Sequence, residues 1–173
     1  MKFFWFILPA IAVAFIPVIA SGCLGGGETT VTAEVTVTVT GTGASSQAEK
    51  NLYTAAINEL TKTANQINTD YRAQIDSYNS GQAKAADLSA KADENWRTYE
   101  AMSSQITEMK VPPEYQEAQK LLISSFNKWQ SAFEAYRDGF RDNDNNMLSK
   151  ARDLDNQAVI EVNQAVNLIS QVQ

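Results

Sequence analysis

The side chains that could do chemistry in this chain of 173 residues are carboxylates, aromatic rings and a single cysteine, because the sequence contains no histidine. Without imidazole, the commonest metal ligand and the usual general base near neutral pH are missing. This excludes a histidine-ligated haem, a histidine-containing zinc site and a Ser/His/Asp triad. A lone cysteine excludes an internal disulfide framework. Since Walker, GxGxxG, GxSxG and CxxC motifs are also missing, we predict a protein that is not an enzyme and has no cofactor.

One acidic segment begins like a calcium loop. Residues Asp142-Asn143-Asp144-Asn145-Asn146 match the start of an EF-hand, but glycine at position six and glutamate at position twelve are replaced by Met147 and Asp153. A polar turn in which Asp144 caps the next helix explains these residues better. Other acidic side chains lie largely off the apolar stripes, as on solvated helix faces, so we expect no metal site: Glu59, Asp70, Asp87, Glu94, Asp153 and Glu161.

Aromatic side chains are the remaining candidates for a site. Tryptophan and tyrosine rings can line a pocket for an apolar or cationic ligand when space remains between helices. The same residues at helical spacing are more often core. The candidate ligand-binding residues are Trp96, Trp129, Tyr71 and Tyr136. A sealed core around the two tryptophans would favour packing, and a cavity there would favour a ligand.

The cysteine follows an apolar segment at the start of the chain. Lys2 precedes an apolar run from residue 3 to 20, which Pro17 interrupts before the small residues of Ala20-Ser21-Gly22-Cys23. A short basic region, an apolar run and small residues are typical of a signal peptide. We therefore predict a signal peptide over 1–22, cleaved between Gly22 and Cys23.

These four residues resemble the lipobox of prokaryotic lipoproteins, although Ala20 stands where bacterial lipoboxes favour leucine. The glycines at 25–27 resemble those that follow the cysteine in archaeal cell-surface lipoproteins. The resemblance implies that Cys23 carries a diacylglyceryl group, and two acyl chains anchor a protein stably. It also implies a position on the extracytoplasmic face of the cell membrane. The alternative is an uncleaved N-terminal anchor with an incidental cysteine, which places the domain on the same side.

A Gly/Thr/Val-rich tether is predicted over 23–45. Valines at 31, 35, 37 and 39 alternate with threonines, a period typical of a strand. Since no second strand is indicated, an extended linker with a mean span of roughly 25 Å is the better interpretation, and an edge strand is the alternative.

Four segments with apolar residues at three-four spacing follow, and they predict an all-α, up-down-up-down antiparallel four-helix bundle over 46–173. The expected helices are about 47–79, 82–109, 113–141 and 145–171. Ser46 and Glu49 form a capping-box pattern. Counting inward from the turns places Trp96 and Trp129 at the height of two alanines, so we expect one tightly filled layer. These alanines are Ala64 and Ala158.

The formal net charge of −6 disfavours nucleic acid as a partner, because phosphates would be repelled. Beyond the lipobox, the chain resembles only loosely the lipoproteins of unassigned function that carry a C-terminal helical bundle. We expect a non-enzymatic surface lipoprotein whose bundle binds or scaffolds an envelope partner. The alternative is an extracytoplasmic sensor-like or carrier bundle that binds a small ligand between its helices.

Overall fold

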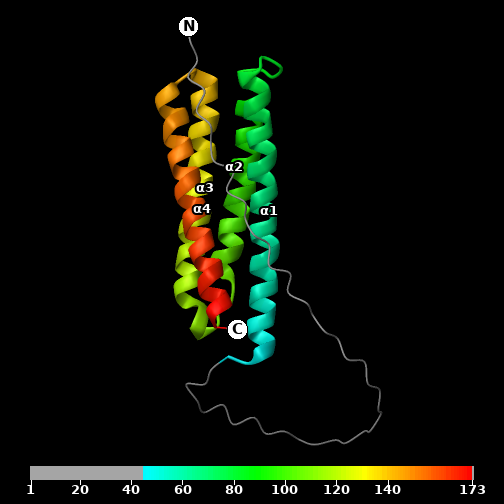
Figure 1. Ribbon diagram of the computed structural model, residues 1–173, viewed down its shortest axis with the longest axis vertical. Helices are drawn as coiled ribbons and strands as arrows, with labels where there is room; N and C mark the ends of the chain where they lie inside the picture. Colours follow the sequence, from blue (N-terminus) through cyan, green and yellow to red (C-terminus); the bar gives the residue numbers. More distant parts are fainter. Residues whose placement is uncertain (1–44, 173) are drawn as a thin grey trace, which may run out of the picture. The chain divides into compact units, whose positions relative to one another are not determined.

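The computed structural model describes residues 45–172, which form an all-α, up-down-up-down four-helix bundle without any strand (Figure 1). The predicted fold class is therefore confirmed. Cys23, Gly22 and the expected tether up to residue 44 lie outside the described residues. The elements are α1 (Gln47–Asn79), α2 (Ala85–Glu108), a 3₁₀ turn η1 (Pro113–Tyr115), α3 (Gln116–Asp142) and α4 (Asn145–Gln171).

Local capping fixes where the helices begin and end. Ser46 and Glu49 satisfy each other's backbone amides in a capping box at the start of α1. Gly81 follows α1 with φ 78°, a conformation that glycine adopts without strain. Asn143 has φ 53° after α3, and the Asp144 side chain accepts hydrogen bonds from two backbone amides of α4. The segment that begins like a calcium loop is therefore a helix cap and turn.

Two helices begin later than expected, for local reasons. The Ser77 carbonyl accepts hydrogen bonds from the amides of Gln82 (2.8 Å) and Ala83 (3.2 Å), so these residues complete the end of α1 and α2 begins at Ala85. Pro113 opens the 3₁₀ turn instead of an α-helix, and α3 follows from Gln116.

Small buried residues recur every seventh position on the two C-terminal helices. Such a repeat keeps one face of each helix smooth, so that two backbones can approach closely. α3 and α4 approach each other closely along their lengths, as do α2 and α3. The repeat consists of Ala118, Ser125, Ala132 and Gly139 on α3, and of Ala151, Ala158 and Ala165 on α4.

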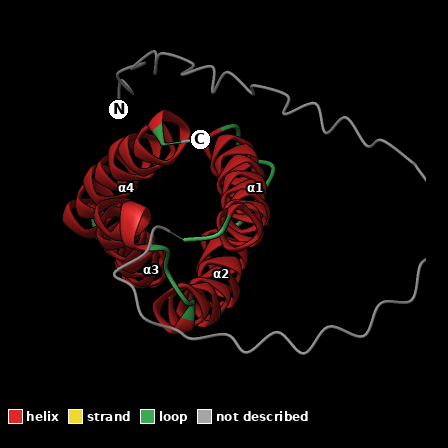
Figure 2. Ribbon diagram, turned by 90° about the horizontal axis from the view of Figure 1, so that it is seen from below, coloured by secondary structure: helices red, strands yellow, loops and turns green. Residues whose placement is uncertain are grey.

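Helix α1 packs differently, because large rings fill a wider space. Close backbone approaches are sparse between α1 and α2, and there are hardly any between α1 and α4. The Tyr53 ring stacks on Tyr115 with centroids 5.3 Å apart, and the Tyr71 ring meets the edge of Phe133 at 5.0 Å. Figure 2 looks along the bundle and shows the four helices around this shared core.

Enlarging one residue of the seven-residue repeat should destabilise the bundle. Ala158 is fully buried, so Ala158→Leu should lower the free energy of unfolding by about 1–3 kcal/mol as the added carbons force helices apart. Urea denaturation followed by circular dichroism measures this change. The matched control is Ala73→Leu on the exposed face of α1, which should leave the midpoint nearly unchanged. Equal midpoints for both variants would show that the α3–α4 interface is not tightly filled.

Candidate functional site

A polar cluster lies in the middle of the bundle, where an aspartate on α4 joins α1 and α3. The Asp155 carboxylate is 9% exposed. Its Oδ1 accepts a hydrogen bond from the Trp129 indole Nε1 at 2.9 Å, and its Oδ2 accepts one from the Arg72 guanidinium at 2.8 Å. Both oxygens of the buried carboxylate are therefore paired, as a buried charge requires.

Tyr99 of α2 extends this cluster toward α1. Its hydroxyl lies 3.1 Å from the Ala64 carbonyl oxygen and 3.1 Å from Asn68 Oδ1, so it shares one proton between two acceptors. Its ring lies between those of Trp129 (5.4 Å) and Phe133 (5.3 Å). All four helices thus contribute to one connected set of aromatic and polar contacts.

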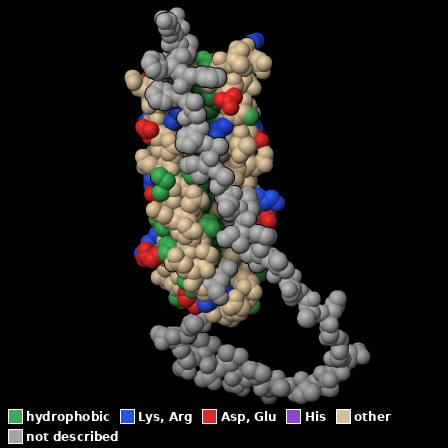
Figure 3. All heavy atoms as spheres, viewed as in Figure 1, with side chains coloured by type: hydrophobic (Ala, Val, Ile, Leu, Met, Phe, Trp, Pro, Cys, Tyr) green, Lys and Arg blue, Asp and Glu red, His purple; other side chains and the backbone are tan. Residues whose placement is uncertain are grey.

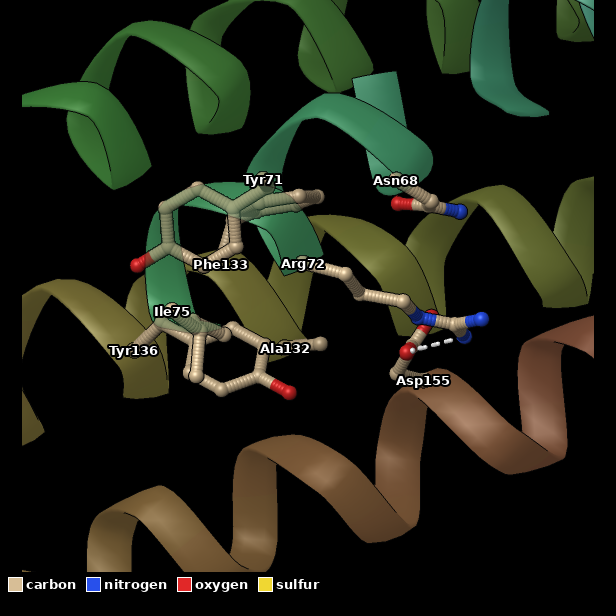
Figure 4. A pocket seen from close by; sticks show the side chains of 8 residues that line it. All are labelled: Asn68, Tyr71, Arg72, Ile75, Ala132, Phe133, Tyr136 and Asp155. Atoms are coloured by element: carbon tan, nitrogen blue, oxygen red, sulfur yellow. Dashed lines mark hydrogen bonds and ion pairs between the residues drawn. The ribbon is translucent and has the colours of Figure 1, made fainter. Parts of the chain in front are cut away.

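A small cavity lies beside the cluster, between α1, α3 and α4 (Figure 4). The Tyr71 and Tyr136 rings border it, with centroids 5.2 Å apart, and Asn68, Arg72 and Asp155 supply polar groups. Its volume is about 10 Å³. This is close to the smallest volume that holds one water molecule, and far below that of an ordinary ligand pocket.

Three of the four aromatic residues proposed from the sequence gather here, and one does not. Tyr71, Trp129 and Tyr136 are buried around or beside the cavity. Trp96 is only half-buried and packs at the edge of the core. The expectation that Trp96 and Trp129 share one inner layer is therefore wrong, and the ring of α2 that lies against Trp129 belongs to Tyr99.

The sequence patterns did not reveal the polar members of the cluster. Asp155 lies four residues after Ala151 and three before Ala158, so its helical register points inward. The same spacing places Asn68 four residues after Ala64. This register is the signal that could have identified both side chains as buried.

Burial determines the ionisation of the cluster's tyrosines. Desolvation is the main cause that raises the pKa of Tyr71, Tyr99 and Tyr136 above the ordinary range, and the Asp155 charge adds to it for the latter two. Burial opposes the charge of Arg72, but the hydrogen bond and charge of Asp155 outweigh it and raise the pKa of the guanidinium. The tyrosines therefore stay neutral and the arginine charged at neutral pH.

No group of carboxylates in residues 45–172 is arranged to hold a metal ion. Of the acidic residues considered from the sequence, five are exposed and one, Glu161, is partly buried and paired with Lys128 at 2.8 Å. Within the same residues, no helix is both long and apolar enough to cross a bilayer.

Fold and site together define an all-α bundle whose aromatic core is closed around a hydrogen-bonded Asp155. A comparison of the chain with known protein families, with curated proteins and with solved structures finds no match to any of them.

Proposed function

We propose that this chain is a non-enzymatic lipoprotein, held by Cys23 on the extracytoplasmic face of the cell membrane, whose bundle binds or scaffolds an envelope partner. The closed core is the observation that carries the binding role. The Asp155 carboxylate is paired with both Trp129 and Arg72, which leaves neither of its oxygens without a partner. The outer surface is then the part of the bundle that meets a partner.

The outer surface suits a protein partner better than a nucleic acid. Side chains of both charges are interspersed on the face seen in Figure 3, with hydrophobic side chains scattered between them. The two most exposed large apolar side chains, Leu52 (73%) and Ile160 (57%), lie on different helices. Single exposed apolar residues are normal on a soluble surface, so contact with a partner would be mainly polar.

The start of the bundle suits a tethered domain. The backbone amide of Ser45 donates a hydrogen bond to Glu114 Oε1 at 3.2 Å, and Lys50 Nζ lies 3.1 Å from the same oxygen. The chain is thus fixed where it enters the bundle, beside η1. A pull on residues before Ser45 would act on α1 first.

The alternative, a sensor-like or carrier bundle for a small ligand, requires a different conformation if the ligand is to lie between Tyr71 and Tyr136. The cavity of about 10 Å³ between Tyr71 and Tyr136 would have to expand greatly to hold even a small organic molecule. Pocket volumes of about 300 Å³ or more are usual for such ligands. A molecule bound in this cavity would therefore have to part α1 from α3 and α4.

Mass spectrometry of the protein extracted from its own membrane tests both parts of the proposal. Under denaturing conditions the chain should begin at a lipid-modified Cys23, and Cys23→Ser should release the domain or leave the precursor uncleaved. Under native conditions the wild-type chain should carry no small molecule. Full-length unlipidated chain would refute the anchor, and a stoichiometric bound molecule would favour the ligand-binding alternative.

A further inference from the structure

Helix α1 is attached to the bundle in a different way from the other three helices. α2, α3 and α4 are held together by small side chains and close backbone approach. The α1 backbone stands farther away, and its buried side chains, such as Ile57, Leu60 and Tyr71, reach across to the shared core. Such an element has the low local contact density that is typical of units that open before the rest of a protein unfolds.

Besides its buried apolar face, α1 makes specific polar contacts with the other helices. The Tyr53 hydroxyl donates to Gln119 Oε1 at 2.7 Å, and the Tyr71 hydroxyl donates to the Leu88 carbonyl oxygen at 3.2 Å. The Ala64 carbonyl of α1 accepts from Tyr99, as described above. Toward α4, the Arg72 guanidinium meets Asp155; the arginine side chain is 53% exposed, whereas the Asp155 side chain is only 12% exposed.

The link between α1 and α2 can act as a hinge. It consists of residues 80–84, with Gly81 in the left-handed conformation. Glycine adopts many backbone conformations at low energy, so the two helices can swing apart without strain at this position. The other end of α1 continues directly into the residues that precede Ser45.

We infer that α1 is an exchangeable helix: it leaves the layer of α2, α3 and α4 as a unit, and the surface beneath it binds the α1 helix of a second copy of this chain. This inference deepens the proposed binding role, because it names the partner. It does not depend on the lipid anchor.

The chemistry of the surface beneath α1 favours a second copy over an unrelated helix. Once α1 leaves, Gln119 loses the hydroxyl of Tyr53, Tyr99 loses its acceptors, and Asp155 loses one of its two donors. A foreign apolar helix would bury these groups unpaired, which weakens binding roughly five- to hundredfold for each group. A second α1 supplies the matching group at each position, so it is the helix that this surface selects.

A locked variant allows a direct test. The bundle contains no cysteine, so Lys50→Cys and Glu114→Cys can be joined by a short bis-maleimide, which ties the first turn of α1 to η1. Since residues 80–84 already hold the other end, the bridged α1 cannot leave. The protein is the full chain with Cys23→Ser in lipid nanodiscs. The probe is a fluorescent peptide of residues 45–79, followed by anisotropy.

We expect the peptide to bind saturably to the chain with the cysteine pair unbridged, and roughly tenfold or more weakly to the bridged chain. A peptide carrying Tyr53→Phe and Tyr71→Phe should also bind roughly tenfold or more weakly, since it keeps both rings but cannot pair with Gln119 and Leu88. Equal binding to bridged and unbridged chains, binding to empty nanodiscs alone, or no binding up to about 100 μM would each overturn the inference. The lipid on Cys23 is not needed in this assay, so failure of the anchor proposal would leave the result unaffected.

Discussion

Raising the pH above 10 should unfold the bundle cooperatively, although the chain has no histidine. All six tyrosines of the chain lie in the described helices or turns, and the pKa of four of them is raised by burial. Desolvation penalises a tyrosinate inside the core. These four are Tyr53, Tyr71, Tyr99 and Tyr136.

Proton linkage determines that the stability of the bundle falls as the pH rises above 10. In the unfolded chain a tyrosine loses its proton near pH 10, whereas in the folded bundle these four keep it to a higher pH. Their stabilising contribution is therefore complete below pH 10 and is lost as the pH rises from 10 toward the folded pKa values. Well above pH 10, each buried tyrosine should remove about 1.4 kcal/mol from the free energy of unfolding per pH unit.

Four such tyrosines give a slope of roughly 5 kcal/mol per pH unit, which is comparable with the whole stability of an ordinary domain. Absorbance of tyrosinate near 295 nm and helical circular dichroism, recorded at the same pH values, measure it. Both signals should change together, since the rings ionise as the helices unfold. Tyr136→Phe should reduce the slope by about one quarter. Ionisation of all six tyrosines near pH 10 with the helices intact would contradict the closed core.

The four helices could be predicted from the sequence because the relevant signals are local. Apolar periodicity, the Ser46 capping box, Gly81 and the two prolines at 112 and 113 act within a few residues and remain the same in any fold. Which side chains of α2 point into the core is harder to predict from local signals. It depends on what the neighbouring helix can accept, and hydropathy alone does not contain that information.

The position of Trp96 shows why this prediction failed. Two overlapping stripes are available on α2, one through Trp96 and one through Asn95 and Ser103, and hydropathy favours the tryptophan. The structure buries Asn95 (3%) and Ser103 (8%) instead. Small polar side chains allow α2 to approach α3 closely, whereas an indole would hold the two backbones apart. The Ser103 hydroxyl contacts Asn127 Oδ1 at 2.6 Å, which satisfies its polar group at the interface.

The aromatic residues of the candidate site could be predicted from the sequence, but the partners of its polar residues could not. Rings such as Tyr71 and Trp129 can be recognised in the sequence because they belong to an apolar stripe. Asp155 is not recognised in this way, because a carboxylate is expected at the surface unless partners surround it. Those partners, Trp129 and Arg72, are 26 and 83 residues away in the sequence. The register of Asp155 between Ala151 and Ala158 points to burial, but only the tertiary structure brings together the partners that make burial of a carboxylate possible.

Truncation of Trp129 should destabilise the bundle far more than truncation of Trp96, because the two side chains differ in burial. Trp129 is 1% exposed and its indole donates to Asp155, so Trp129→Ala should remove a large buried side chain, leave a cavity and strip the carboxylate of one donor. The expected loss is about 3–5 kcal/mol in the free energy of unfolding from burial and cavity, with a further cost of about 1–3 kcal/mol for the unpaired carboxylate oxygen. Trp96→Ala, on the half-buried residue, should cost less than about 2 kcal/mol.

Trp129→Phe separates the hydrogen bond from the packing, because phenylalanine keeps most of the ring volume and removes the indole N–H. The free energy of unfolding of Trp129→Phe should lie between those of the wild type and Trp129→Ala. Urea denaturation measures the three losses. Emission spectra of Trp96→Ala and Trp129→Ala variants that also carry Trp5→Phe, and so keep one tryptophan each, should place Trp129 in an apolar environment and Trp96 in a wetter one. If Trp129 instead lined a ligand pocket, its truncation would cost little in the empty protein and its emission would be red-shifted and readily quenched. The closed core, and with it the proposal that the outer surface carries the function, therefore depends on Trp129→Ala being the more damaging substitution.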